Sequence, residues 1–135
     1  MKDSATSARV REALLRRARA AMKCAYAPYS KFQVGAAVLL QDGRIFTGCN
    51  VENASYGLTI CAERSAIFAA VAASARKPAI VAVAVVNRRA VPCSPCGACR
   101  QVIAEFGPGA MVWYLGGKGI VGRTMRELLV DGFVL

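Results

Sequence analysis

The spacing of apolar residues predicts an amphipathic helix over residues 6–25, near the amino terminus. Apolar side chains recur every three or four positions and form one stripe, and most of the arginines and lysines of the segment fall outside it. The stripe consists of Val10, Leu14, Leu15, Ala18 and Met22. The Ala-Pro-Tyr-Ser sequence at residues 27–30 then ends the helix, because proline cannot continue it.

Apolar runs further along the chain predict four strands. Residues 32–40 and 44–50 flank residues 41–43, whose Asp-Gly pair is typical of a β-hairpin turn. Residues 79–86 are apolar throughout and rich in β-branched side chains, as expected of a buried central strand. A last apolar run at residues 111–115 predicts the fourth strand.

Three further helices are predicted over residues 61–75, 97–105 and 124–129. Residues 53–57 are read as a loop, and the glycine-rich residues 116–119 as a flexible turn that lacks the spacing of a phosphate-binding loop. Strands that alternate with helices after an opening hairpin indicate one mixed sheet covered by helices. We therefore expect an α/β fold in a single domain over residues 1–135.

The composition narrows the possible classes of function. Of the 135 residues, 56% are hydrophobic, which allows a sizeable core and excludes a disordered protein. The longest apolar runs are far shorter than the roughly 20 residues that cross a bilayer, so we expect no membrane association. The net charge of +10 comes from arginines scattered along the sequence, so we read it as a solubility feature and expect no nucleic-acid partner. The absence of histidine excludes mechanisms that need an imidazole base or ligand.

The six cysteines suggest metal or redox chemistry rather than disulfides. Cys93, Cys96 and Cys99 follow one another at intervals of three residues, which is a metal-ligand or redox spacing. No signal peptide is recognised, so we expect reduced thiols and a cytoplasmic location. We expect Cys24 and Cys49 to be buried as small apolar side chains and Cys93 to be a loop thiol.

Two cysteine motifs together favour a catalytic zinc site. Cys96 and Cys99 stand one turn apart at the start of a predicted helix and direct their sulfurs the same way, and Cys61 at the start of another helix can supply a third sulfur. Helix amino termini stabilise thiolates. Zinc with three protein ligands keeps one position open for water, as catalytic zinc sites do.

Glu63 and Arg64 complete this candidate site. Glu63 follows Cys61 by two residues, so it can face the metal without binding it and move a proton between water and a substrate nitrogen. Arg64 can offset the net negative charge of three thiolates around Zn²⁺. Two alternatives stay open. Glu63 can be an acid favoured only by the helix dipole, and Cys93 can complete a closed structural site of four cysteines, which would have no use for Glu63.

These motifs belong to a longer pattern that closely resembles the small zinc-dependent cytidine deaminases of nucleoside salvage. The resemblance runs from about residue 21 to residue 133. The matching stretches are residues 27–37 (APYSKFQVGAA), 48–54 (GCNVENA), 61–64 (CAER), 94–101 (SPCGACRQ) and 127–129 (ELL). The resemblance implies a three-layer α-β-α sandwich with one mixed five-stranded sheet, one zinc ion per subunit and assembly as a homotetramer.

The same resemblance implies roles for individual residues. Cys61, Cys96 and Cys99 correspond to the zinc ligands, Glu63 to the proton shuttle, and Arg64 to an arginine that hydrogen-bonds the thiolates. The positions that correspond to substrate contacts are Phe32, Asn50, Glu52, Ala54, Tyr56, Ala62 and Phe133.

Four of the substrate positions have specific expected partners. Asn50 and Glu52 match residues that hydrogen-bond the ribose hydroxyls, and Phe32 matches an aromatic that packs against the pyrimidine. Phe133 matches an aromatic that enters the pocket of a neighbouring subunit. From the residues alone, Phe32 is better read as a core residue, and Glu52 can instead make a structural hydrogen bond or salt bridge.

The resulting expectation is hydrolytic deamination of cytidine and 2′-deoxycytidine, with a nucleoside as the partner molecule. A second hypothesis is a deaminase of a modified cytosine nucleoside such as blasticidin S, because relatives of that kind resemble the chain around both zinc motifs. A third is a non-catalytic zinc-binding or nucleic-acid-binding module, which predicts that Glu63→Gln leaves function intact.

Overall fold

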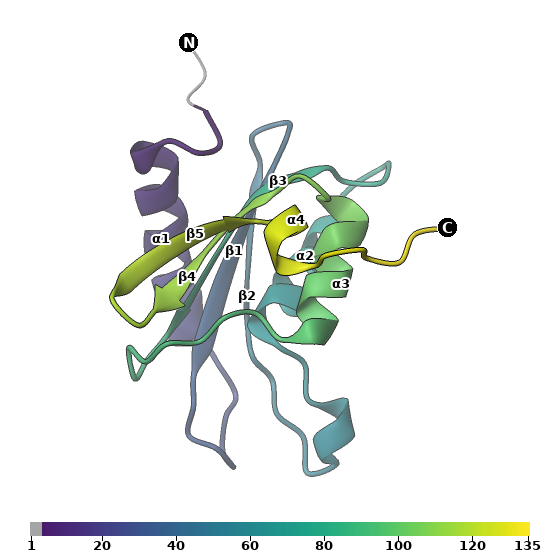
Figure 1. Cartoon of the computed structure of the whole chain (residues 1–135). Coiled ribbons are helices and arrows are strands. Elements are labelled where there is room, and N and C mark those ends of the chain that lie inside the picture. Colours follow the sequence, from purple (N-terminus) through teal and green to yellow (C-terminus); the bar gives the residue numbers. More distant parts are fainter. Residues whose placement is uncertain (1–3) are drawn as a thin grey trace.

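Five strands form one sheet in the order β2-β1-β3-β4-β5 in the computed structural model, which describes residues 4–135 (Figure 1). The first three residues of the predicted domain lie outside the described residues. The strands are β1 (Val34–Leu40), β2 (Ile45–Cys49), β3 (Ile80–Asn87), β4 (Met111–Gly116) and β5 (Gly119–Thr124). Strands β3 and β4 pair in parallel and the other neighbours are antiparallel, which confirms the expected mixed sheet.

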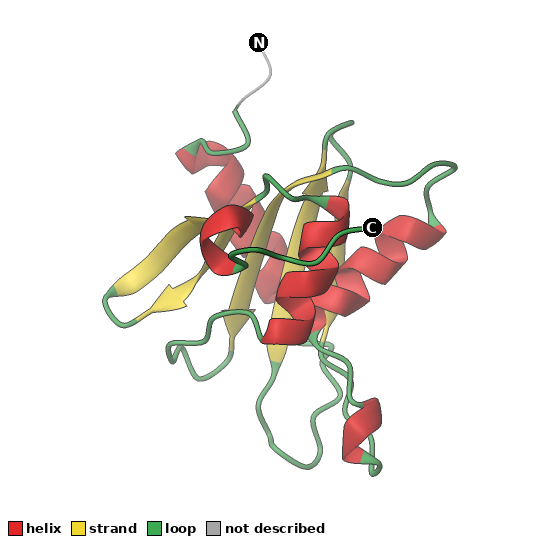
Figure 2. Cartoon of the chain, turned by 45° about the vertical axis from the view of Figure 1, so that its right-hand side comes forward, coloured by secondary structure: helices red, strands yellow, loops and turns green. Residues whose placement is uncertain are grey.

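Helices cover both faces of the sheet (Figure 2). The helices are α1 (Ala8–Met22), α2 (Ala62–Ala72), α3 (Gly97–Phe106), α4 (Met125–Leu128) and the 3₁₀ turn η1 (Tyr56–Leu58). Helix α1 packs alone on one face, where Leu14, Leu15 and Ala18 meet the sheet around Trp113. Helices α2, α3 and α4 pack on the other face around a second cluster that includes Ile67 and Ile103. The expected three-layer α-β-α sandwich is thereby confirmed.

Two glycines bring helices close to the sheet and so help to position the site. A Cβ atom on Gly35 of β1 would lie 2.0 Å from the carbonyl oxygen of Ala18 in α1. A Cβ atom on Gly48 of β2 would lie 2.4 Å from the amide nitrogen of Ala66 and 2.7 Å from the carbonyl oxygen of Ala62 in α2. Only glycine allows this approach, and it sets the amino-terminal end of α2 beside the carboxyl end of β2.

The predicted elements are confirmed, with ends that differ by at most three residues. Helix α1 begins after Ser7 because the Ser7 side chain accepts a hydrogen bond from the Val10 amide at 3.2 Å and so caps the helix. Helix α2 begins at Ala62 because Cys61 is its extended N-cap residue, with φ −72° and ψ 156°. The predicted loop at residues 53–57 contains the start of η1.

Strand β5 is absent from the sequence pattern, and residues 116–119 form a tight hairpin rather than a flexible turn. Gly116 pairs with Gly119, whose φ of +118° favours glycine. Most residues of β5 are small or exposed, so no apolar run marks the strand. Trp113 of β4 packs against Gly122 of β5, because a Cβ atom at Gly122 would lie 2.9 Å from the indole nitrogen. The apolar contact of β5 therefore comes from its neighbour β4.

None of the helices within residues 4–135 combines the length and the apolar character that a bilayer crossing requires.

Candidate metal centre and active site

Three cysteine sulfurs meet where α2 and α3 begin. The ligand atoms of Cys61, Cys96 and Cys99 all lie within 4.8 Å of one another, and the Sγ atoms of Cys61 and Cys96 are 3.8 Å apart. Cys61 and Cys96 are the N-cap residues of α2 and α3, and the Cys96 Sγ accepts a hydrogen bond from the Cys99 amide at 3.5 Å. Within residues 4–135 this is the one such group of three or more metal-ligating side chains.

The surroundings of the Cys61 sulfur favour a thiolate. The Arg64 Nη2 donates to the Cys61 Sγ at 3.3 Å. The pKa of Cys61 falls to about 5, first because the Cys99 thiol donates a hydrogen bond to it and then because Arg64 does, while burial opposes the change. The hydrogen bond between Cys99 and the Cys61 sulfur raises the pKa of Cys99. The separate hydrogen bond from Arg64 to the same sulfur raises the pKa of Arg64. A compact set of cysteine sulfurs at two helix amino termini fits Zn²⁺, whereas Mg²⁺ and Ca²⁺ prefer oxygen ligands.

Glu63 lies in the first turn of α2 and is only 4% exposed. Burial raises the pKa of Glu63 to about 7, and the neighbouring Cys61 thiolate acts in the same direction. A buried carboxyl group in this state can both accept and donate a proton near neutral pH. Its place beside the three sulfurs is the one that a proton carrier at a zinc site needs.

A cavity of about 200 Å³ opens in front of Glu63 and the sulfurs. The residues that line the cavity belong to strands, to the starts of helices and to the loops beside them, and most of these residues are apolar. The lining residues are Phe32, Val34, Asn50, Thr59, Cys61, Ala62, Glu63, Val85, Cys93, Ser94 and Cys96. A small apolar cavity with a few polar groups is typical of a site for a planar ring.

Asn50 holds one wall of this cavity in place. Asn50 is 8% exposed, and its side chain bonds to the backbone of the residues immediately before and after Gln33. The Asn50 Oδ1 accepts from the Val34 amide at 2.8 Å, and the Asn50 Nδ2 donates to the Phe32 carbonyl at 2.8 Å. Phe32 therefore lines the cavity on a backbone that Asn50 fixes. The structure places Phe32 at the cavity rather than within the main core.

Glu52 lies in an adjoining hollow of about 390 Å³, which shares Thr59 with the first cavity. The Glu52 Oε1 accepts from the amides of Tyr29 at 2.9 Å and Ser30 at 3.1 Å, and its Oε2 accepts from the Ser30 hydroxyl. The Ser30 hydroxyl is the main reason that the pKa of Glu52 is lowered. Glu52 thus makes structural hydrogen bonds, the alternative left open from the sequence, in a place that also faces the hollow.

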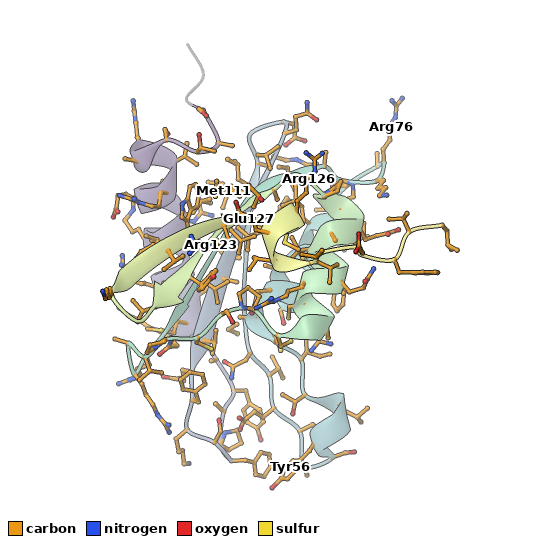
Figure 3. All side chains as sticks on the ribbon, in the orientation of Figure 1. Tyr56, Arg76, Met111, Arg123, Arg126 and Glu127 are labelled. Carbon is orange, nitrogen blue, oxygen red and sulfur yellow. The ribbon has the colours of Figure 1, made fainter. Side chains whose placement is uncertain are left out.

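The other predicted substrate positions are more widely spread. Tyr56 lines the same hollow as Glu52 and stands at the end of a projecting loop, with its ring 6.2 Å from that of Tyr29 (Figure 3). Ala54 is exposed in the loop before η1. Phe133 is 71% exposed and lies beside α3, where the Gln101 Nε2 donates to its carbonyl oxygen at 3.2 Å. Phe133 is therefore not part of the cavity of its own chain.

Some residues at the site have no role predicted from the sequence. Ser30 anchors Glu52, and Thr59 lines both hollows. Cys93, expected to be a loop thiol, lies in a loop and lines the cavity without joining the three sulfurs. Ser30 lies inside the stretch that carries the resemblance, which is the only signal that could have singled it out. The expectation that Cys24 is buried is wrong: it follows the end of α1, off the apolar stripe, and is exposed, while Cys49 is only partly buried.

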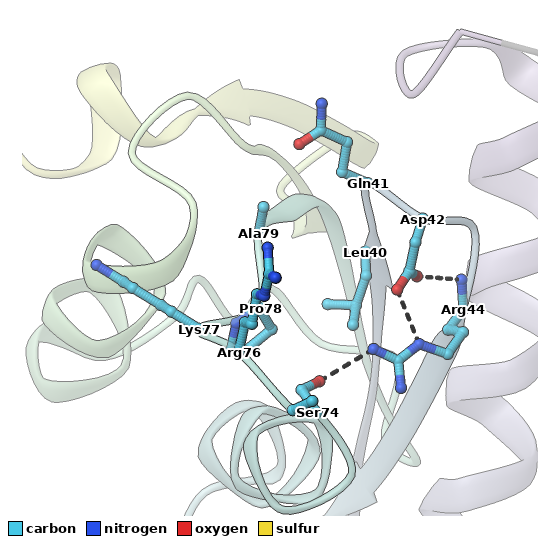
Figure 4. A pocket seen from close by; sticks show the side chains of 10 residues that line it. Leu40, Gln41, Asp42, Arg44, Ser74, Arg76, Lys77, Pro78 and Ala79 are labelled. Atoms are coloured by element: carbon cyan, nitrogen blue, oxygen red, sulfur yellow. Dashed lines mark hydrogen bonds and ion pairs between the residues drawn. The ribbon is translucent and has the colours of Figure 1, made fainter.

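A larger hollow of about 620 Å³ lies at the other end of β1 and α2 but offers no comparable chemistry (Figure 4). Its central cation, Arg44, is already engaged by the Asp42 carboxylate at 2.9 Å, the Ala73 carbonyl at 3.1 Å and the Ser74 hydroxyl at 3.1 Å. Lys77 extends toward Glu105, 4.0 Å away. The candidate site is therefore the smaller cavity, where the sulfurs and Glu63 converge.

Comparison with known proteins agrees with this geometry. The family model described as the cytidine and deoxycytidylate deaminase zinc-binding region matches residues 8–115. A cytidine deaminase of Halalkalibacterium halodurans is 49% identical over 125 residues, covering 91% of this chain and 93% of the relative. One of Sporosarcina psychrophila is 50% identical over 122 residues, covering 90% and 88%.

A solved structure gives the same result. The crystal structure of cytidine deaminase from Burkholderia pseudomallei superposes with a TM-score of 0.82 at 50% identity, covering 90% of this chain and 98% of that one. The chain therefore belongs to the zinc-binding cytidine and deoxycytidylate deaminase family. The family expected from the sequence motifs is confirmed.

Proposed function

We propose that this protein hydrolyses cytidine and 2′-deoxycytidine to uridine and 2′-deoxyuridine with release of ammonia. The observation that carries the proposal is the buried Glu63 beside three converging cysteine sulfurs in a cavity of about 200 Å³. Relatives about half identical over most of their length are cytidine deaminases. Purified zinc-loaded protein incubated with cytidine should release ammonia and uridine in equal amounts.

Glu63 moves the protons of the reaction in this proposal. Zinc bound by Cys61, Cys96 and Cys99 would supply Lewis-acid activation of water. Glu63 accepts one proton from the water and delivers it to ring nitrogen 3 of the base. It then takes the remaining proton from the oxygen now bonded to carbon 4 and passes it to the amine, so that the bond from carbon 4 to nitrogen breaks and ammonia leaves. Its burial keeps bulk water away from these transfers. Arg64 balances part of the thiolate charge through its hydrogen bond to Cys61.

Asn50 and Glu52 retain hydrogen-bonding capacity for the ribose. An amide nitrogen carries two hydrogens, and Asn50 uses one of them on the Phe32 carbonyl. A carboxylate accepts about four hydrogen bonds, and three protein donors contact Glu52. With the base in the cavity that Phe32 and Asn50 line, the sugar would lie where this cavity meets the adjoining hollow of Glu52.

Glu52→Ala should raise the KM for cytidine by about tenfold, because a hydrogen bond to a charged acceptor is lost. Turnover of 2′,3′-dideoxycytidine, which lacks both hydroxyls, should change little. Steady-state kinetics on the two nucleosides checks this, with Glu105→Ala as the control because Glu105 is an exposed acid on α3. An equal rise in KM for both nucleosides would contradict the ribose role and indicate that Glu52 acts only through Tyr29 and Ser30.

We further propose a homotetramer with one zinc ion per subunit. The outward side of α2 is apolar, with Phe68 49% and Val71 40% exposed. Residues 66–72 of α2 are apolar on all sides. Such a helix segment is usually buried, but in one chain part of it stays exposed. Phe133, exposed and remote from the cavity of its own chain, is free to enter that of a neighbour.

Phe68→Lys should convert the assembly to smaller species, because a charge would replace apolar contact in the proposed interface. Light scattering after size-exclusion chromatography measures this directly. Ala20→Lys on the exposed side of α1 is the matched control and should leave the molar mass unchanged. A tetramer that persists in Phe68→Lys would place the interface elsewhere.

We place the reaction in pyrimidine nucleoside salvage in the cytoplasm. All six cysteines are free thiols, a state that a reducing compartment preserves.

A further inference from the structure

We propose that Arg89 is a positioning residue that holds the aromatic wall of the nucleoside site. The proposal rests on the proposed function, because it assigns Phe32 to the wall against which the pyrimidine packs. Arg89 itself does not line the cavity, so it acts through Phe32.

One guanidinium group contacts the wall segment at two points. The Arg89 Cζ lies 5.4 Å from the centroid of the Phe32 ring, within the range of a cation–π contact. The Arg89 Nη2 donates to the Ser30 carbonyl oxygen at 3.0 Å. The planar guanidinium can stack on the ring and direct its N–H groups at the carbonyl together, which a lysine ammonium cannot match.

The segment between these two points needs outside support. Lys31 has a φ of +60°, a conformation that residues other than glycine rarely adopt. The Phe32 amide donates to the Ser30 hydroxyl at 3.0 Å, and Asn50 holds the Phe32 carbonyl. These bonds help to hold the backbone of Phe32, and the bond from Arg89 to the Ser30 carbonyl oxygen adds to them. Among the described residues, only Arg89 makes a cation–π contact with the Phe32 ring. Arg89 therefore sets the orientation of the ring.

Arg88 provides a matched control at the next position. It carries the same charge, and its Nη1 donates to the Gln33 Oε1 at 2.9 Å. Arg88 thus contacts the same segment but makes no cation–π contact with Phe32. Arg88→Ala and Arg89→Ala both remove one positive charge from the rim of the site, so an effect of charge alone would be equal in the two variants. An effect of ring positioning would be seen only in Arg89→Ala.

Hydrogen exchange in the ligand-free protein tests the positioning role independently of activity. Arg89→Ala should accelerate exchange of the Phe32 amide by about tenfold, since its segment loses a charge-assisted hydrogen bond and a cation–π contact. Arg88→Ala should change it less than about twofold, and Arg89→Lys should give an intermediate rate. Equal exchange in the parent and Arg89→Ala, or an equal increase in both alanine variants, overturns the proposal.

Kinetics on cytidine then tests the consequence for the substrate. Arg89→Ala should raise KM about fivefold and change kcat less than about twofold, because the ring contacts the base while the proton path through Glu63 is untouched. Zinc content should equal that of the parent. A fall in kcat with constant KM contradicts the proposal. A parent that binds zinc but does not deaminate cytidine contradicts the proposed function instead, and the exchange rates then decide the positioning role alone.

Discussion

Glu63→Gln should lower cytidine turnover by about three orders of magnitude while zinc binding and folding are retained. A general acid–base group contributes roughly 10²–10⁴ to a rate, and this carboxyl group serves several proton transfers in turn. Glutamine has nearly the same shape and fills the same buried position, but it cannot accept and return a proton. Glu63 is 4% exposed, so bulk water cannot easily replace it as the proton carrier.

Steady-state kinetics with zinc analysis of the same samples checks this prediction. Glu127→Gln is a suitable control, since Glu127 belongs to the capping box at the start of α4, away from the cavity. Its turnover should stay within about twofold of the parent. A Glu63→Gln variant that keeps more than about a tenth of the parental rate would contradict the role of Glu63 and favour the hypothesis of a helix-dipole acid.

Cys96→Ala should lose both zinc and activity. Cys96 supplies one of the three sulfurs of the cluster. Its Sγ also accepts a hydrogen bond from the Cys99 amide in the first turn of α3. Two remaining sulfurs leave the metal without the ligand set of a catalytic site. The variant should also melt at a lower temperature than the zinc-loaded parent, because metal binding stabilises the folded state. Zinc content by atomic emission and the thermal midpoint are the measurements.

Cys93→Ala is the matched control for the cysteine assignment. Cys93 lines the same cavity, three residues from Cys96, but it lies outside the cluster of sulfurs. It should therefore bind zinc as the parent does. Equal loss of zinc in Cys93→Ala and Cys96→Ala would contradict the three-ligand site and favour a closed structural site of four cysteines.

The sequence pattern predicts the fold as far as apolar periodicity reaches. The hairpin β1–β2, the buried strand β3 and the helices that begin near Cys61 and Cys96 all carry strong local signals. Strand β5 carries none, because its apolar contact comes from Trp113 on β4 and its backbone pairing replaces side-chain burial. Such a strand depends on its neighbour in the sheet, which a local pattern does not contain.

The chemistry of the site is similarly predictable only where it is local. Cys61 and Glu63, and likewise Cys96 and Cys99, are close in sequence, so their spacing already suggests a metal and a proton carrier. The wall of the cavity is different. Arg89 meets Ser30 across 59 positions of sequence, a contact that exists only because the loop after β3 lies beside the start of β1.

Glu52 illustrates how structure refines a prediction. Its isolated charge in an uncharged stretch indicates that it needs polar partners. The structure supplies protein partners in Tyr29 and Ser30 and also places the carboxylate at a hollow beside the cavity. A structural bond and a substrate contact are therefore compatible for this residue, whereas the sequence presents them as alternatives.

The most direct test of the central claim is a time course of ammonia and uridine formation from cytidine by purified zinc-loaded protein, run beside Glu63→Gln and with 2′-deoxycytidine and blasticidin S as parallel substrates. We expect equal amounts of ammonia and uridine from the parent, turnover of 2′-deoxycytidine as well, and a rate about a thousandfold lower in Glu63→Gln. A folded, zinc-loaded parent that releases no ammonia from cytidine or 2′-deoxycytidine would contradict the claim. Release from blasticidin S alone would then assign the site to modified cytosine nucleosides.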